Sequence, residues 1–253
     1  MFSTTGHDMR HAGAGRRDAM MMTLLVVLAV SAALIAGAAW GIYGRMGDTT
    51  RAFLVALAGG ALVLSLVTEL VEPSVERSSL AMAMMGVAAG AVVFAVVDYL
   101  IDEYWGPDSG GGLLAAITLD GIPENLALGV ALIGAGVGEV AALAGSILLS
   151  NLPEAAGSAR EMAAHGGRSK LRILGIWAAT AGLLSLAALA GNLLLDTVGE
   201  GVLAFIRCFA AGAVVASLAT EVFPQAYQDD KHLAGVATAL GLILALVLGN
   251  IGG

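Results

Sequence analysis

The chain has 253 residues, of which 58% are hydrophobic and only 13% are charged, and its formal net charge is −8. Soluble domains average about 45–50% apolar and about 25% charged residues, so this composition excludes an ordinary soluble protein. The sequence has no basic stripe, which excludes nucleic-acid binding, and no strand-like alternation at about 10-residue spacing, which argues against an outer-membrane barrel. We therefore predict an all-α polytopic membrane protein.

Residues 1–19 form a polar N-terminal stretch that ends in the arginine pair Arg16 and Arg17. We interpret it as a soluble tail. The apolar run that follows is longer than the roughly 7–15 residues of a signal-peptide core, so we expect a retained signal-anchor helix. Residues 20–253 are then expected to form a single transmembrane transporter domain.

Eight apolar windows follow the tail, each near the roughly 17–25 residues that a bilayer-spanning helix requires. Their connections are short and rich in glycine or charge, so we expect no soluble domain between them. The predicted spans are Met20–Tyr43, Ala52–Val71, Leu80–Ile101, Leu113–Gly136, Val140–Ala163, Leu171–Leu195, Leu203–Phe223 and Leu233–Ile251.

The orientation is predicted from a dense basic cluster between the fifth and sixth spans, from Arg160 to Arg172. Because positively charged loops stay in the cytoplasm, this cluster favours both termini outside the cytoplasm. The pair Arg16 and Arg17 before the first span argues the other way. We expect an integral protein of a bacterial inner membrane with extracytoplasmic termini.

Two segments of the chain repeat one another. Ala52–Glu69 and Ala204–Glu221 align without a gap at an offset of 152 residues, with ten of eighteen positions identical, and a proline follows each. Extended to the neighbouring spans, the repeat gives helices 1–3 and 6–8 on either side of a unique central pair, helices 4 and 5. An odd number of helices in each half implies an inverted repeat, the usual construction of secondary transporters.

The central pair carries a duplicated Pro-Glu motif. The fourth span reads "DGIPEN" from Asp120 to Asn125, and the fifth reads "SNLPE" from Ser150 to Glu154. Asp120 and Glu124 are four residues apart and so share one helical face, as do Ser150 and Glu154. A proline inside a helix leaves a backbone carbonyl without its amide partner, and such carbonyls are tolerated at membrane depth where they line a watery or ion-filled cavity.

Carboxylates are costly inside a bilayer, and few basic residues accompany these. Either the acids carry protons or a cation neutralises them. All four histidines lie in the tail or the loops, so an intramembrane cation site would offer oxygen ligands, which suit Mg, Ca and Mn best and are tolerated by Zn and Fe. The candidate metal ligands are Asp120, Glu124, Ser150, Asn151 and Glu154.

Four further residues in apolar runs have simpler interpretations. Glu69 and Glu221, at equivalent repeat positions near span ends, are expected to be solvated interfacial acids, and Asp98 is expected to be a lone acid near a span end. The single cysteine, Cys208, excludes an internal disulfide and is expected to be a small buried hydrophobe.

The two Pro-Glu motifs resemble those of the Zrt/Irt-like (ZIP) family of divalent metal transporters, whose fourth and fifth helices carry a His-Asn-x-Pro-Glu-Gly motif and a related x-x-x-Pro-Glu motif. The resemblance implies eight spans in a 3+2+3 arrangement and assigns Glu124 and Glu154 as metal ligands. Asp120 stands where the family usually has histidine, and Gly121 where it often has asparagine. This exchange of imidazole for carboxylate makes the site harder and more anionic.

We therefore expect a transporter of divalent transition metals such as Zn, Fe, Mn or Cd, which would be the transported substrate and not a cofactor. The other partner is the lipid bilayer, and a homodimer is left open. The alternative is a proton-coupled carrier of a non-metal polar or cationic solute, which would use the acids as a proton relay. We do not expect an enzyme, since a metal-dependent hydrolase would need a histidine or a nucleophile facing the site.

Overall fold

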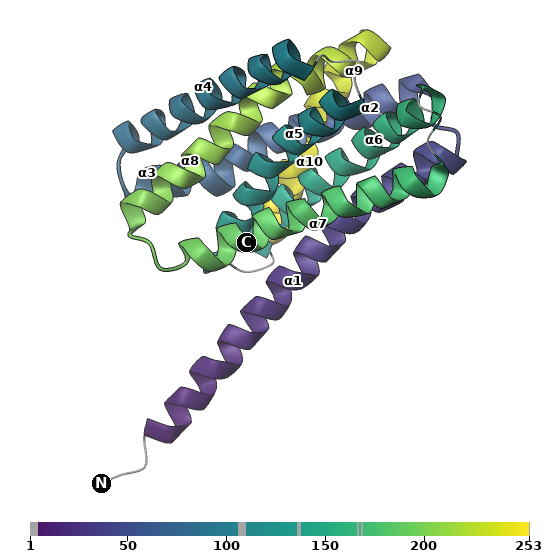
Figure 1. The fold of residues 1–253 in the computed structure, drawn as a ribbon. Helices are drawn as coiled ribbons and strands as arrows, with labels where there is room; N and C mark the ends of the chain where they lie inside the picture. The colour runs from purple at the N-terminus through teal and green to yellow at the C-terminus, as the bar shows by residue number, and fades with distance from the viewer. Residues whose placement is uncertain (1–4, 106–109, 136–137, 166, 168, 253) are drawn as a thin grey trace.

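The structure is a computed structural model that describes residues 5–105, 110–135, 138–165, 167 and 169–252, and the regular elements in this part are all helical. They form eight long rods, two of which contain a π-helical turn (Figure 1). In chain order the elements are α1 (Thr5–Tyr43), α2 (Asp48–Leu66) continued by η1 (Val67–Val71) and α3 (Glu72–Arg77), α4 (Leu80–Trp105), α5 (Gly110–Ala131), η2 (Gly138–Val140), α6 (Ala141–His165), α7 (Lys170–Leu195), α8 (Glu200–Ser217) continued by η3 (Leu218–Val222) and α9 (Phe223–Asp229), and α10 (Leu233–Gly252).

Within the residues that the structure describes, six of the rods are long and apolar enough to cross a membrane, in agreement with six of the predicted spans. They are Ala19–Tyr43, Asp48–Arg77, Leu80–Ile101, Lys170–Leu195, Glu200–Asp229 and Leu233–Ile251. The other two rods, α5 and α6, contain the Pro-Glu motifs. The helical fold and the six apolar spans are confirmed, while the eight-span 3+2+3 arrangement stays a prediction.

The bounds of two predicted segments differ from the structure. Helix α1 begins at Thr5, so most of the predicted tail continues the first helix, which extends well beyond the bundle (Figure 1). Helix α5 ends at Ala131, five residues before the predicted end of the fourth span. Gly134 follows with a φ of 72°, a left-handed conformation that glycine adopts without steric cost and that turns the chain toward α6.

The helices pack in pairs that join one half of the sequence to the other. Helix α2 packs against α10 and α4 packs against α8, while α1 packs against α6 and α5 packs against α7. This set of pairs is symmetric. If α1 is exchanged with α7, α2 with α8, α4 with α10 and α5 with α6, the same four pairs result. The contacts of α2 with α6 and of α8 with α5 are exchanged in the same way.

Glycines at equivalent positions set the distance between the paired helices. An added Cβ at Gly60 in α2 would lie 2.1 Å from the carbonyl oxygen of Thr238 in α10, and one at Gly212 in α8 would lie 2.1 Å from that of Val87 in α4. Gly60 and Gly212 are 152 residues apart, which is the offset of the sequence repeat. Small residues of this kind let membrane helices approach closely.

Replacing Gly60 with alanine is expected to lower the free energy of unfolding by about 1–3 kcal/mol, because the methyl group would force two backbones apart. Gly235→Ala in α10 is the matched control, since no atom lies within 4 Å of the Cβ it would add. Thermal unfolding in detergent measures both variants. Equal melting temperatures would contradict the close packing of α2 on α10.

A buried ion pair fastens the start of α2 to the end of α9. Arg51 is 8% exposed, and its Nε and Nη2 donate hydrogen bonds of 2.9 and 3.0 Å to the two carboxylate oxygens of Asp229. The contrasting pair, Arg160 with Asp48, is largely exposed. Removing one partner of a buried pair leaves an uncompensated charge, whereas exposed pairs contribute little.

We expect Asp229→Asn to lower the stability by about 3 kcal/mol, because the buried Arg51 guanidinium would keep only its 4.0 Å contact with the half-exposed Glu161. Asp48→Asn, which breaks the exposed pair, is the control and should leave the melting temperature unchanged. Thermal unfolding in detergent compares the two variants. If both lost the same stability, the burial of Arg51 would not be the cause.

Candidate functional site

The Pro-Glu motifs lie in the middle of α5 and α6, where Pro123 and Pro153 are internal to the helices. Their polar side chains are largely removed from the surface: Glu124 is 4% exposed, Ser150 0% and Asn151 2%, while Glu154 is half-buried. Buried polar groups normally find partners, so the contacts of these side chains decide what the site can do.

Three of the predicted site carboxylates come together. Glu124 is close enough to both Glu154 and Asp120 for their charges to interact unfavourably, and Glu154 also interacts with Asp120. In the part of the chain that the structure describes, no Lys or Arg side chain forms an ion pair with any of the three. The cluster therefore lacks an internal counter-ion.

The other two predicted residues position this cluster. The Ser150 hydroxyl donates a hydrogen bond to Oε1 of Glu154 one turn later in α6. The Asn151 side chain donates from Nδ2 to the backbone carbonyl of Val30 in α1, at 3.1 Å. Ser150 thus orients a carboxylate, and Asn151 fixes α6 to α1 while its side-chain oxygen is available as an acceptor.

Asp120 also contacts a second polar group, which comes from the repeat helices. Its carboxyl lies close enough to Glu221 in η3 and to Ser217 at the end of α8 for a polar interaction, and Glu221 in turn interacts with Asp98 in α4. The expectation of a lone acid at Asp98 and a solvated acid at Glu221 is therefore wrong. Oδ1 of Asp120 and Oε1 of Glu221 are buried without a hydrogen-bond partner.

Part of this second group could have been found in the sequence. Ser217 and Glu221 are four residues apart in the repeated Ser-Leu-x-Thr-Glu segment, so they share one helical face as Asp120 and Glu124 do. The sequence pattern did not show that this face would meet α5, because that contact depends on how the helices pack.

Glu69, the repeat counterpart of Glu221, is not a fully solvated acid either. Its Oε1 accepts a 2.9 Å hydrogen bond from the backbone N–H of Leu143 in the first turn of α6, and its Oε2 is buried without a partner. The first amides of a helix have no partner within the helix, so a carboxylate there is stabilised by both hydrogen bonding and the helix dipole.

Both repeat glutamates lie in π-helical turns. Glu69 is within η1 and Glu221 within η3, and each turn is followed by a proline near the start of the next α-helix. π-helical turns are rare and are found frequently at functional sites. The two repeated segments therefore share a π-helical turn as well as similar sequence, and each turn carries a glutamate at the equivalent position of the repeat.

The chemistry of the cluster favours a cation or a proton. Among the described residues, no group of three or more His, Cys, Asp or Glu side chains is arranged so that it could hold a metal ion. The donor atoms nearby are carboxylates, one hydroxyl and one amide oxygen, all hard ligands. Cys208 is fully buried and lies apart from this donor set, as expected for a small hydrophobe.

Comparison with known proteins adds no family assignment. No protein-family model matches the chain, and no curated protein matches its sequence.

Proposed function

We propose that the chain transports divalent transition-metal cations across a membrane through the carboxylates of α5 and α6, in the manner of the Zrt/Irt-like family. The observation that carries the proposal is the meeting of Glu124, Glu154 and Asp120 without a basic partner. Isolated buried charges cost several kcal/mol each, so such a cluster requires a compensating positive charge. A divalent cation supplies it.

The proposed ligands are Asp120, Glu124 and Glu154, with the oxygens of Ser150 and Asn151 and water completing the shell. Since no three acids among the described residues are arranged around a metal position, binding would draw the carboxylates together. Neutralisation of their mutual repulsion would favour that movement. A carboxylate-rich site suits Mn best, with Zn, Fe and Cd as further candidates.

The packing symmetry supports a transporter architecture. Exchange of the two halves preserves the helix pairs, as in transporters whose inverted repeats flank a central site. We therefore propose the eight-span 3+2+3 arrangement with extracytoplasmic termini. Its orientation can be tested with single cysteines placed in the 44–47 and 196–199 loops, since the native Cys208 is fully buried and would give little background labelling.

One observation favours a second candidate, a proton-coupled carrier of a non-metal solute. Glu221 lies close to both Asp120 and Asp98, and two neighbouring carboxyl groups can share a hydrogen bond only when one of them carries a proton. Three carboxyls joined in this way would form a short proton relay. The same relay would also serve a metal transporter that exchanges protons for metal.

Uptake into vesicles distinguishes the two candidates. Purified protein reconstituted into liposomes should accumulate radioactive or dye-detected Mn, Zn, Fe or Cd above the level of protein-free liposomes, and an excess of a second divalent metal should compete. If none of the four metals enters or binds, while an imposed proton gradient is dissipated by the protein, the proton-coupled carrier is supported and the metal proposal is overturned.

A further inference from the structure

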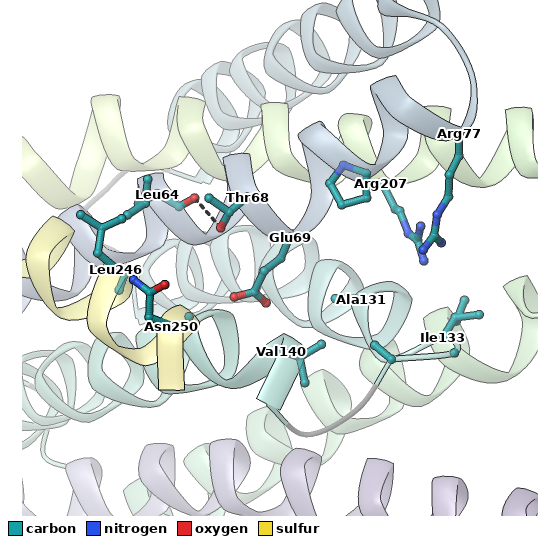
Figure 2. A pocket seen from close by; sticks show the side chains of 15 residues that line it. Leu64, Thr68, Glu69, Arg77, Ala131, Ile133, Val140, Arg207, Leu246 and Asn250 are labelled. Atoms are coloured by element: carbon teal, nitrogen blue, oxygen red, sulfur yellow. Dashed lines mark hydrogen bonds between the residues drawn. The ribbon is translucent and has the colours of Figure 1, made fainter. Parts of the chain in front are cut away.

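A second polar site lies in a cavity of about 460 Å³, separate from the acidic cluster. Its walls come from the end of α2 with η1 and α3, the end of α5 and the turn after it, η2, α8 and the end of α10 (Figure 2). Its charged and polar lining residues are Thr68, Glu69, Arg77, Arg207 and Asn250. We find no role for this cavity in metal transport.

Arg207 is the most unusual residue of this cavity. It is 4% exposed, its Nη2 donates a 3.3 Å hydrogen bond to the carbonyl of Val130, and its Nε is buried without a partner. Within the described residues it forms no ion pair, and the favourable charge that acts on it most is that of Glu200, the first residue of α8. A buried guanidinium with an unused donor is costly unless a ligand accepts from it.

A second arginine faces the first. Figure 2 draws the guanidinium groups of Arg77 and Arg207 pointing to the same part of the cavity, and Arg77 is near enough for its positive charge to act unfavourably on Arg207. Two adjacent guanidinium groups present a fork of N–H donors that matches a carboxylate or a phosphate. An acidic oxygen group between them would use the free donor and remove the repulsion.

The same cavity contains a carboxylate oxygen that has no partner. Oε2 of Glu69 is buried without a partner, and neither Arg77 nor Arg207 lies within ion-pair distance of this carboxylate. Figure 2 shows the Glu69 carboxylate extending into the cavity between Asn250 and the two arginines. The cavity therefore keeps opposite charges apart.

We propose that this cavity binds a small zwitterion, with an acidic oxygen group on Arg77 and Arg207 and an ammonium group on Glu69. One ligand of this kind satisfies both buried atoms that lack partners. Leu246, which also lines the cavity, is 52% exposed on α10, so the cavity adjoins the apolar outer surface of the bundle. The zwitterion can thus be the headgroup of phosphatidylethanolamine or a free solute such as phosphoethanolamine.

The experiment uses the full chain in detergent and compares the two sources. Native mass spectrometry measures binding of phosphatidylethanolamine, phosphatidylglycerol and phosphatidylcholine with identical acyl chains, and thermal unfolding measures stabilisation by phosphoethanolamine in water. Preference for phosphatidylethanolamine without an effect of phosphoethanolamine identifies the lipid, and stabilisation by phosphoethanolamine identifies the free solute. If phosphatidylethanolamine binds no better than the other two lipids and phosphoethanolamine gives no stabilisation, the proposal is overturned.

Two variants assign the charges within the cavity. Arg77 is exposed, so Arg77→Gln should fold, and it is expected to weaken zwitterion binding about tenfold by removing a charged donor. Glu69→Gln should abolish the preference for an ammonium-bearing ligand over phosphatidylglycerol while binding of the acidic group persists. Arg172→Gln, at an exposed arginine of α7, is the control. Unchanged binding in both Arg77→Gln and Glu69→Gln would refute this arrangement.

Discussion

Changing Glu124 to glutamine is expected to lower divalent-metal uptake into vesicles at least about 100-fold. The substitution keeps the size of the buried side chain and removes the negative charge that the metal would bind. Changes to groups that only support a metal ligand cost about 10- to 100-fold, so the loss of a direct ligand should cost at least as much. Glu154→Gln should have a similar effect.

Thermal unfolding accompanies this uptake measurement. Removing one of several carboxylates that repel each other should leave the protein as stable as before or more stable. Lost uptake with unchanged stability therefore separates a missing ligand from a misfolded protein. Glu76→Gln, at an exposed glutamate of α3, is the control. If Glu124→Gln and Glu154→Gln transported all four metals like the parent, the assigned site would be wrong.

Changing Asp120 to histidine is expected to shift the metal preference toward Zn over Mn by about tenfold, a difference of about 1.4 kcal/mol. Imidazole nitrogen suits Zn, whereas carboxylate oxygen suits Mn. The variant restores the residue that the Zrt/Irt-like motif usually has at this position. Competition between Zn and Mn in the vesicle assay measures the shift.

Asp120→Asn is the matched control for this prediction, because it removes the charge without adding an imidazole. It should lower uptake of both metals and leave their ratio unchanged. If histidine and asparagine gave the same ratio, Asp120 would not contribute to metal selection. Its contacts with Ser217 and Glu221 would then be its main role.

The helical elements could be predicted from the sequence because apolar runs of bilayer length, separated by glycine and charge, permit few other structures. The two repeated sequence segments correspond in the structure to α2 with η1 and to α8 with η3. Helix ends were less predictable. The residues after Ala131 are still apolar, so hydropathy alone extends the predicted span beyond the true end of α5. The chain instead turns there, at Gly134.

The candidate site was predictable only in part. Asp120, Glu124 and Glu154 are close in the structure because helical spacing and the duplicated motif put them on neighbouring helices. Glu221 joins them from η3 and Asp98 from α4, and these are tertiary contacts that no local pattern encodes. Arg207 was missed for a similar reason: one arginine in an apolar run does not indicate that a cavity and a second arginine will face it.

The pairing of α2 with α10 and of α4 with α8 means that neither half of the sequence is structurally self-sufficient. Each of these two pairs takes one helix from each repeat, and the glycine contacts that join them cross the centre of the chain. Two copies of the ancestral unit would therefore be intertwined, not set side by side. Any motion that opens the bundle therefore has to separate groups of helices that each contain helices from both repeats. The contact between Asp120 and Glu221 joins two such groups.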